Sequence, residues 1–454
     1  MLIQGPFRGA VLWSRQATLG SWLRSRSTVQ ARLDAGKVAV GAAVAALIVL
    51  GGMARLGDGL WALRAGGGGV RVFDGIPMAW EWIDVATTTW LFDGDPRWTS
   101  DRVIIRTDHL IRFVPGIPIA LLGVWTGHAW RASILATWLC WFAAAAATYA
   151  LCRALVPATA RGHRIGCIAA FLVALSPGFA AYVGNIEVRP FAYAAAPLAL
   201  LALERARALR PASPGIPPGT DLRQHPYLLA AVLFLANGTL ELGPPLLVML
   251  WLTYVLLDGR AGSPPLAGRV RWAAQVTLGY VALAAGWWAI GHVATLGRAS
   301  VSEQNDAWYR IFDAMARERP GWSALSARLW NVQQNAIPTF TLPVVALLVP
   351  GILVLPRRAA VWAVVWIGAI VAAILLTRHW PRNLYLAYPA VYLAAAAAID
   401  RAGALLATCL PAGAPRMRAV LLWLPASGFL YLVGRIALGD LAGDLSLVQV
   451  WWPQ

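Results

Sequence analysis

Charged side chains are scarce in this sequence. Asp, Glu, Lys and Arg together make up 13% of its 454 residues, against about 25% in a soluble domain. Apolar residues make up 59% of the chain, and its mean hydropathy is +0.60. Apolar runs of about 17 to 20 residues recur from end to end, and each can cross a bilayer core of about 30 Å. The composition excludes a soluble globular protein and predicts an all-α polytopic membrane protein.

Lysine is almost absent. Lys37 is the only Lys among 38 basic residues, and with 21 acidic residues the net charge is +17. A chain this basic suggests nucleic-acid binding, but its Arg residues stand in the gaps between apolar runs. That placement follows the positive-inside rule and suits contact with anionic lipid headgroups. We therefore expect membrane lipids, and no nucleic acid, as partners.

Cysteine and the common catalytic motifs are also sparse. The four cysteines form no Cys-x-x-Cys pair and lie in or beside apolar runs, at Cys140, Cys152, Cys167 and Cys409. We expect neither a disulfide framework nor a metal site. The sequence has no P-loop, no Rossmann glycine pattern, no HExxH helix and no GxSxG serine elbow,. The first 36 residues contain no apolar h-region, so we expect no cleavable signal peptide,.

Apolar and polar stretches divide the chain into regions. Residues 1–37 are a basic segment, either an amphipathic helix on the cytoplasmic surface or a disordered tail,. Residues 38–440 form the membrane domain, with a first external loop at 55–112 and a second at 297–340, and residues 441–454 are a short tail. The apolar segments are predicted at 38–54, 109–127, 132–151, 165–183, 189–204, 226–239, 243–257, 273–295, 341–356, 359–377, 384–400 and 418–438.

Clusters of Arg set the expected orientation, because short loops rich in Arg stay cytoplasmic. Residues 1–37 and 153–164 can both be cytoplasmic only if an even number of segments cross the membrane between them. Three apolar segments lie between them, however. Segment 109–127 contains Pro115 and Pro118, and Pro disrupts a helix interior. We expect it to be kinked, re-entrant or otherwise not a simple crossing. The other clusters predicted to be cytoplasmic are 205–223, 260–271, 357–358 and 401–418.

The first external loop holds the carboxylates that could do chemistry. Glu81 and Asp84 are three residues apart and share one face of a helix, and their flanking tryptophans suit the headgroup level. They are either two solvated carboxylates on an interfacial helix or the place of a general base. Asp108 and His109 end the loop. They are either a solvated dipeptide or a pair that binds a hydroxylated substrate or assists proton transfer.

Two later loops place charges at the membrane edge, where an ionised side chain is costly. Glu187 and Arg189 either pair with each other, or Glu187 contacts an acceptor while the guanidinium of Arg189 binds a phosphate. Arg378 and Arg382 are predicted to be external, against the positive-inside trend. They either flank a span or grip an anionic headgroup.

Three stretches of the chain resemble the signature motifs of one family. They read Trp82-x-Asp84-x-Ala86, then Leu175-Ser176-Pro177-Gly178-Phe179 with Glu187-x-Arg189-Pro190-Phe191-Ala192-Tyr193, and finally Arg382-Asn383-Leu384-Tyr385-Leu386-Ala387-Tyr388-Pro389-Ala390. In this order they resemble the dolichyl-phosphate-mannose-protein mannosyltransferase-like family, of the PMT/ArnT-like, glycosyltransferase family 39 type.

This resemblance implies the GT-C fold, a bundle of about 11 to 13 transmembrane helices with interfacial helices in a large first external loop. It implies transfer of a hexose or pentose from a polyprenyl-phosphate-linked donor, as co-substrate, to a lipid, polysaccharide or protein acceptor. The reaction would take place on the external face of a bacterial inner (plasma) membrane, with the N-terminus cytoplasmic. A transporter, flippase or non-catalytic lipid-binding protein is the alternative, because it would have the same spans and the same Arg residues.

The resemblance also implies roles for residues. In such enzymes an Asp of the first loop acts as base toward the acceptor hydroxyl, and basic side chains hold the lipid phosphate. By position Asp84 is the base, with Glu81 and Asp108 as further catalytic candidates. The family's Asp-Glu pair is Asp84-Val85 here, so the second carboxylate is missing or is replaced by Glu81. The substrate-binding candidates are His109, Glu187, Arg189, Arg378 and Arg382.

Overall fold

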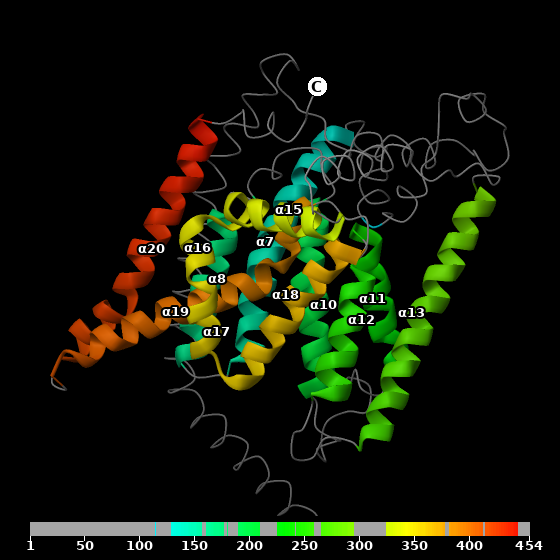
Figure 1. Cartoon of the computed structure of the whole chain (residues 1–454), viewed down its shortest axis with the longest axis horizontal. Helices are drawn as coiled ribbons and strands as arrows, with labels where there is room; N and C mark the ends of the chain where they lie inside the picture. The colour runs from blue at the N-terminus through cyan, green and yellow to red at the C-terminus, as the bar shows by residue number, and fades with distance from the viewer. Residues whose placement is uncertain are drawn as a thin grey trace, which may run out of the picture. The chain divides into compact units, whose positions relative to one another are not determined.

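The chain is helical wherever its structure is described (Figure 1). The computed structural model describes residues 114, 129–156, 160–176, 179, 189–208, 225–240, 242–257, 265–294, 324–376, 381–411 and 414–443. These residues contain no strand and belong to one compact unit. Four helices among them are long and apolar enough to cross a membrane, at Ala136–Leu155, Arg357–Leu375, Asn383–Thr408 and Pro415–Ile436. The prediction of an all-α polytopic membrane protein is confirmed.

Each apolar segment predicted from residue 132 onward is helical in its described residues, although segments 243–257 and 341–356 are each divided into two helices. The helices are α7 (Ala129–Leu155), α8 (Ala160–Leu175), α10 (Arg189–Ala208), α11 (Pro226–Leu240), α12 (Gly243–Met249), η1 (Leu250–Leu256, a π-helical turn), α13 (Leu266–Ala294), α15 (Ala324–Phe340), α16 (Leu342–Ala346), α17 (Leu348–Val354), α18 (Arg357–Leu376), η2 (Pro381–Ala387, a 3-10 helix), α19 (Tyr388–Thr408) and α20 (Pro415–Gly443). Segments 1–37 and 38–54 lie outside the described residues, as does 109–127 apart from Val114.

The sequence explains where several helices begin and end. α8 ends at Leu175 although the apolar run was predicted to reach 183, because Pro177 lacks the amide donor that would continue the helix. α12 and α19 each carry Pro in their first turn, where the missing donor costs nothing. The predicted external loop 297–340 contains helix α15 in its second half, since its apolar residues recur at helical spacing.

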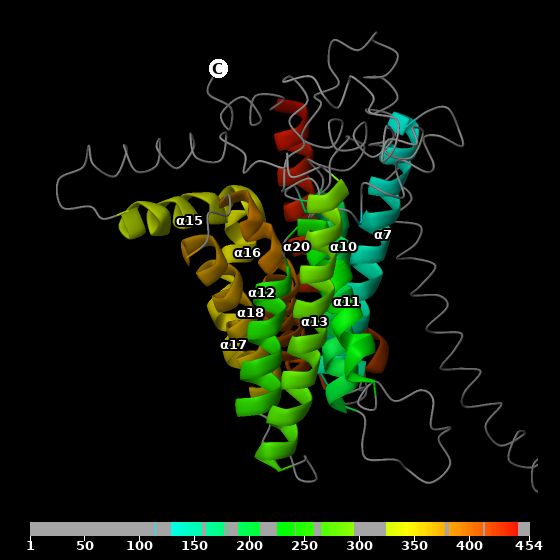
Figure 2. The same cartoon turned by 90° about the vertical axis from the view of Figure 1, so that its right-hand side faces the viewer.

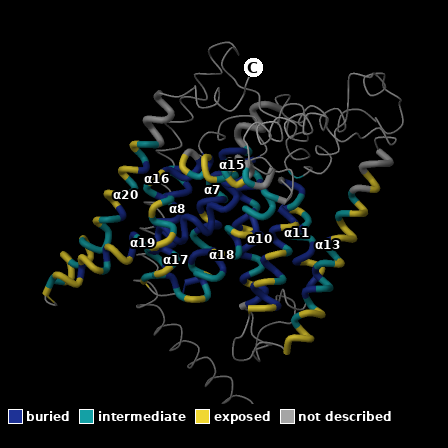
Figure 3. The backbone as a smooth tube through the Cα atoms, viewed as in Figure 1, coloured by how far each residue is buried: buried dark blue, intermediate teal, exposed yellow. Residues whose placement is uncertain are grey.

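The first half of helix α19, whose residues 388–397 are all buried, lies at the centre of the described bundle in the dark blue region of Figure 3, whereas its end is largely exposed. It packs against α8, α17, α18 and α20. In its apolar window 67% of the residues are buried, whereas in that of α20 only 11% are. The reason is its run of alanines, which lets neighbouring backbones approach closely. At Gly351 of α17, for example, a β-carbon would collide with the backbone carbonyl of Ala394.

Two ends of the bundle can be distinguished by their charge. One ion pair joins the start of α8 to the second half of α19, and another joins the end of α10 to the start of α18. Arg161 of α8 also donates to the carbonyl of Val354 at the end of α17, so these Arg residues gather at one end. We call this the Arg-rich end. The opposite end contains the end of α8, the start of α10, the end of α15 and η2, because Tyr392 binds Ser176 and η2 packs against α10 and α15. Helix α15 lies across this end in Figures 1 and 2. The gathering of Arg at one end is what the positive-inside rule requires.

Candidate functional site

Six buried aromatic rings meet at the end opposite to the Arg-rich end. Tyr385 of η2 is at their centre. Its ring centroid lies 4.6 Å from that of Tyr193 on α10 and 5.0 Å from that of Tyr388 on α19. These separations are typical of favourable edge-on and stacked contacts. We call this set the aromatic cluster, and its members are Phe179, Tyr193, Phe340, Tyr385, Tyr388 and Tyr392.

Hydrogen bonds fix the elements of the aromatic cluster to one another. The hydroxyl of Tyr388 donates to the backbone oxygen of Tyr193 at 2.6 Å. The hydroxyl of Tyr392 donates to Oγ of Ser176, also at 2.6 Å. Each of these side chains is buried, and a buried hydroxyl that is satisfied in this way holds one geometry. α19 is therefore tied to both α8 and α10.

The aromatic cluster joins two of the three stretches that carry the family resemblance. Ser176, Phe179 and Tyr193 come from the stretch at 175–193, and Tyr385 and Tyr388 come from the stretch at 382–390. About 200 residues of chain separate them, yet their rings touch. The third stretch, at 82–86, lies outside the described residues.

Buried polar side chains surround the same end. Arg189 begins α10 and is 3% exposed. The same end also contains the buried polar side chains of Asn335, Thr339, Thr341 and Asn383, which belong to α15, its junction with α16, and η2. Thr341 joins α15 to α16 with φ of 69°, a backbone region that a β-branched residue rarely adopts. Guanidinium, amide and hydroxyl groups can together bind phosphate and sugar oxygens.

The structure describes only part of the predicted site. Of its members, Arg189 is described with its side chain, and Arg382 with its backbone, as the second residue of η2. The packing of η2 against α10 and α15 brings the segments of these two Arg residues to the same end. The remaining predicted residues lie outside the described part of the chain: Glu81, Asp84, Asp108, His109, Glu187 and Arg378.

Sequence reasoning did not single out the tyrosines as a unit. Tyr385, Tyr388 and Tyr392 are three and four residues apart, which is the spacing of one helix face. That spacing was the available signal. The buried acids Glu204 and Asp400 were also missed as ion-pair centres, since their Arg partners Arg358 and Arg161 stand far away in the sequence.

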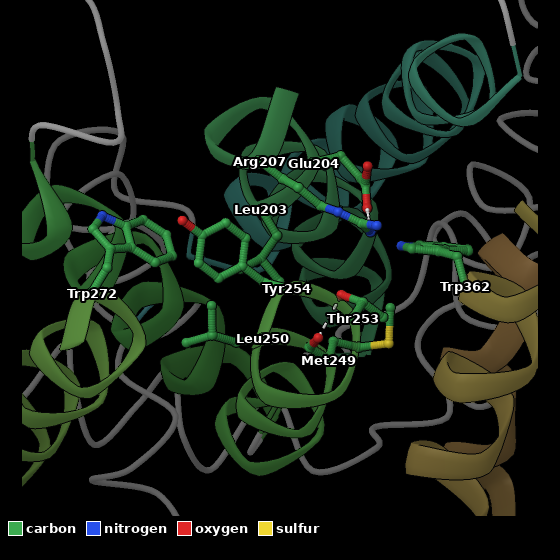
Figure 4. Close-up of a pocket in the computed structure, with 9 residues that line it drawn as sticks. All are labelled: Leu203, Glu204, Arg207, Met249, Leu250, Thr253, Tyr254, Trp272 and Trp362. Carbon is green, nitrogen blue, oxygen red and sulfur yellow. Dashed lines mark hydrogen bonds and ion pairs between the residues drawn. The ribbon is translucent and has the colours of Figure 1, made fainter. Parts of the chain in front are cut away.

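The other chemical features belong to the Arg-rich end. A pocket between α10, α12, η1, α13 and α18 is lined by Glu204 and Arg207 and by apolar and aromatic side chains (Figure 4). On α10, Tyr193 of the aromatic cluster and Glu204 of the pocket are separated by about 16 Å, at 1.5 Å per residue. Within the described helices no three His, Cys, Asp or Glu side chains gather in a metal-binding group, and all four cysteines are free.

Comparison with known proteins finds similarity in structure only. No protein-family model and no curated protein matches the sequence. The crystal structure of ArnT from Cupriavidus metallidurans in the apo state is similar with 17% identity and a TM-score of 0.47, over 88% of this chain and 73% of that one. The Archaeoglobus fulgidus oligosaccharyltransferase, in complex with zinc and sulfate, is similar with 16% identity and a TM-score of 0.43.

The second similarity covers 74% of this chain but 44% of the oligosaccharyltransferase chain, so this protein spans less than half of its length. Both TM-scores lie below 0.5, and the argument for function therefore rests on the residues of this chain. Its apolar helices, with four long enough to span a bilayer, identify it as an integral membrane protein.

Proposed function

We propose that this protein is a membrane glycosyltransferase, which transfers a sugar from a polyprenyl-phosphate-linked donor to an acceptor on the external face. The observation that carries the proposal is the aromatic cluster, in which two stretches resembling motifs of such enzymes are in contact. The contact forms at the end away from most of the Arg clusters. Under the positive-inside rule that end faces outward.

The donor phosphate has a candidate binding place at the start of α10. Arg189 supplies a guanidinium there, and the N-terminus of a helix adds a positive partial charge. Both attract a phosphate, and a guanidinium can bind two of its oxygens at once. Arg382 lies in η2, which packs against α10. Arg378 precedes η2 by three residues, within about 10 Å of extended chain.

The acceptor needs a base, and the family resemblance gives this role to Asp84. The carboxylate takes the proton of the acceptor hydroxyl, whose oxygen attacks the anomeric carbon of the sugar. The bond from that carbon to the phosphate oxygen breaks, and the polyprenyl phosphate leaves with its negative charge held by the Arg side chains. Such a displacement inverts the anomeric carbon. Since Val85 follows Asp84, a single carboxylate has to serve, unless Glu81 assists.

The test is glycosyl transfer by the purified full-length protein, with a panel of synthetic polyprenyl-phosphate hexoses and pentoses and with native membrane extract as acceptor source. Asp84→Asn is expected to lower turnover by about 10²–10⁴-fold, the usual contribution of a general base. Asp74→Asn, a change in the same loop, is the control. Arg189→Gln is expected to raise KM for the donor, and the exposed Arg205 at the other end of α10 provides its control as Arg205→Gln.

Two results would contradict the proposal at different levels. Full turnover by Asp84→Asn removes Asp84 as the base but keeps the enzyme class. If the wild type consumes no polyprenyl-phosphate sugar but moves a solute or a lipid across liposomes, the protein is a transporter or flippase.

A further inference from the structure

Helix α10 contains a proline in its interior, four residues after the tyrosine that it contributes to the aromatic cluster. This residue, Pro197, is buried. In an α-helix the amide of each residue donates to the carbonyl four residues before it, but proline has no amide hydrogen and its ring crowds that carbonyl. The carbonyl of Tyr193 therefore lacks the donor that the helix would otherwise supply.

The hydroxyl of Tyr388 stands in for this missing amide. It belongs to α19, 195 residues away in the sequence, and it donates to the backbone oxygen of Tyr193 at 2.6 Å. Both tyrosines are fully buried, and a buried carbonyl without a donor is costly. The hydrogen bond from α19 thus replaces the one that Pro197 removes from α10.

The ring that carries this hydroxyl is itself held in place. It stacks on the ring of Tyr385, with centroids 5.0 Å apart and an angle of 18° between the ring planes. The residues that follow it on α19, up to Ala397, are all buried. Helix α10 packs along α7 and α11, so the hydroxyl of Tyr388 adds a fixed point from a third side, on the central helix of the bundle.

This fixed point lies in the part of α10 that carries Arg189. Arg189 and Tyr193 are four residues apart, so they share one face of the helix and are separated by about 6 Å along its axis. Because Pro197 removes a hydrogen bond, the first two turns are joined less firmly to the rest of α10. The position of the buried Arg189 therefore depends on a contact from outside the helix, and small displacements of a binding group weaken what it binds.

We propose that Tyr388 is a positioning residue, which holds the first turns of α10, and with them Arg189, where the donor phosphate binds. Tyr388 acts through the backbone of Tyr193, without contact to the sugar or the phosphate. The inference rests on the proposed function for the identity of the ligand, a polyprenyl-phosphate-linked sugar. The hold on α10 can be measured without any ligand.

The first measurement is hydrogen exchange of the full-length protein in detergent, followed at the amides of residues 193–196. These amides make the first hydrogen bonds within α10. Tyr388→Phe removes the hydroxyl and keeps the ring. It is expected to speed their exchange about three- to tenfold, the range for one hydrogen bond between membrane helices. Tyr392→Phe is the matched control, because its hydroxyl binds Ser176 at the end of α8; exchange in α10 should stay at the wild-type rate.

A second substitution tests the cause. Pro197→Ala gives α10 an amide of its own for the carbonyl of Tyr193, so in that background Tyr388→Phe is expected to have no further effect on exchange. In glycosyl transfer, Tyr388→Phe is expected to raise KM for the donor by about three- to tenfold with kcat little changed, and Pro197→Ala should reverse the rise. Poor folding would lower the amount of active protein, and hence the apparent kcat, without this change in KM.

Two results would overturn the proposal. If Tyr388→Phe keeps wild-type exchange and wild-type KM, the hydroxyl positions nothing. If Pro197→Ala does not reverse the effects of Tyr388→Phe, the hydroxyl is not a replacement for the missing helix bond. A wild type that consumes no polyprenyl-phosphate sugar overturns the proposed function instead. In that case faster exchange in Tyr388→Phe, reversed by Pro197→Ala, still supports the hold of Tyr388 on α10.

Discussion

At the Arg-rich end of the bundle, Glu204 and Asp400 each bind two Arg side chains and so connect helices distant in the sequence. At the opposite end, aromatic rings and tyrosine hydroxyls make the corresponding connections. The acid of each ion cluster is buried, but Arg161 and Arg358 are 38% and 31% exposed. In the aromatic cluster every ring is at least 96% buried.

This difference follows from what each end must do in a membrane. Arg residues that set the orientation have to remain at one interface, and pairing them with buried acids lowers the cost of holding charge there. The other end also holds a buried charge, Arg189, but its described contacts between helices are made by aromatic rings and hydroxyls. Its contacts are directional, through hydroxyls and ring edges, and such contacts hold neighbouring groups in fixed positions. A frame of that kind suits a substrate site.

The largest effect is expected when the centre of the aromatic cluster is removed. Tyr385→Ala deletes the ring that touches Tyr193, Phe340 and Tyr388. It should lower the free energy of unfolding by about 3–5 kcal/mol, because the cavity leaves these rings without contacts. Unfolding of the purified protein in increasing dodecyl sulfate measures the loss. Tyr431→Ala is the control, since Tyr431 is 71% exposed; equal losses in both variants would show that the cluster does not hold its end together.

Removing a buried acid at the Arg-rich end is expected to lower the free energy of unfolding somewhat less. Asp400→Ala leaves Arg161 and Arg164 without their carboxylate, whose oxygens are 3.2 and 2.7 Å from them. A fully buried pair broken in this way costs about 3–5 kcal/mol. For Asp400→Ala we expect the free energy of unfolding to fall by about 2–3 kcal/mol, because water partly screens the charge of Arg161. Thermal unfolding in detergent measures it, with the exposed Arg401 changed to Ala as control. A loss below about 0.5 kcal/mol would mean that the ion pairs are incidental.

Part-way between the two ends, the backbones of α17 and α19 are in close contact at Gly351. This contact allows a third comparison, between a glycine in a tight contact and one with open space around it. A β-carbon on Gly351 would collide with the carbonyl of Ala394, whereas one on Gly368 would meet nothing within 4 Å. Gly351→Ala is therefore expected to destabilise by about 1–3 kcal/mol. Gly368→Ala is expected to stabilise by up to about 1 kcal/mol, because alanine favours the helix. Opposite signs in the same unfolding assay confirm the prediction, and equal signs contradict it.

The sequence predicted the helices well because length and apolar composition decide them. Each run from residue 132 onward is helical where it is described, two of them as a pair of helices. Where a boundary moved, as at Leu175, a proline two residues later explains the shift,. The partners of the helices could not be predicted in this way. The Asp400 contacts of Arg161 and Arg164 join residues more than 230 positions apart, and nothing in local periodicity encodes such a pairing.

For a related reason, only some residues of the candidate site could be predicted from the sequence. Arg189 stood out because a charge at a membrane edge is conspicuous in sequence, and it is buried at the start of α10. The tyrosines did not stand out because apolar spans commonly contain aromatic residues. Their significance lies in hydrogen bonds to Ser176 and to the Tyr193 backbone, which only the packing of α8, α10 and α19 creates.

The smallest effect concerns the hydroxyls of the aromatic cluster. Tyr392→Phe and Ser176→Ala each remove one side of a 2.6 Å hydrogen bond, and a double-mutant cycle isolates its energy. We expect a coupling of about 0.6 kcal/mol and at most about 1.7, the range for hydrogen bonds between membrane helices. The same cycle with Tyr388→Phe and Ser176→Ala should give a smaller coupling, because Tyr388 donates to the Tyr193 backbone instead. If both cycles give the same value, the hydrogen bond between Tyr392 and Ser176 adds no stability of its own, and ring packing holds these side chains in place.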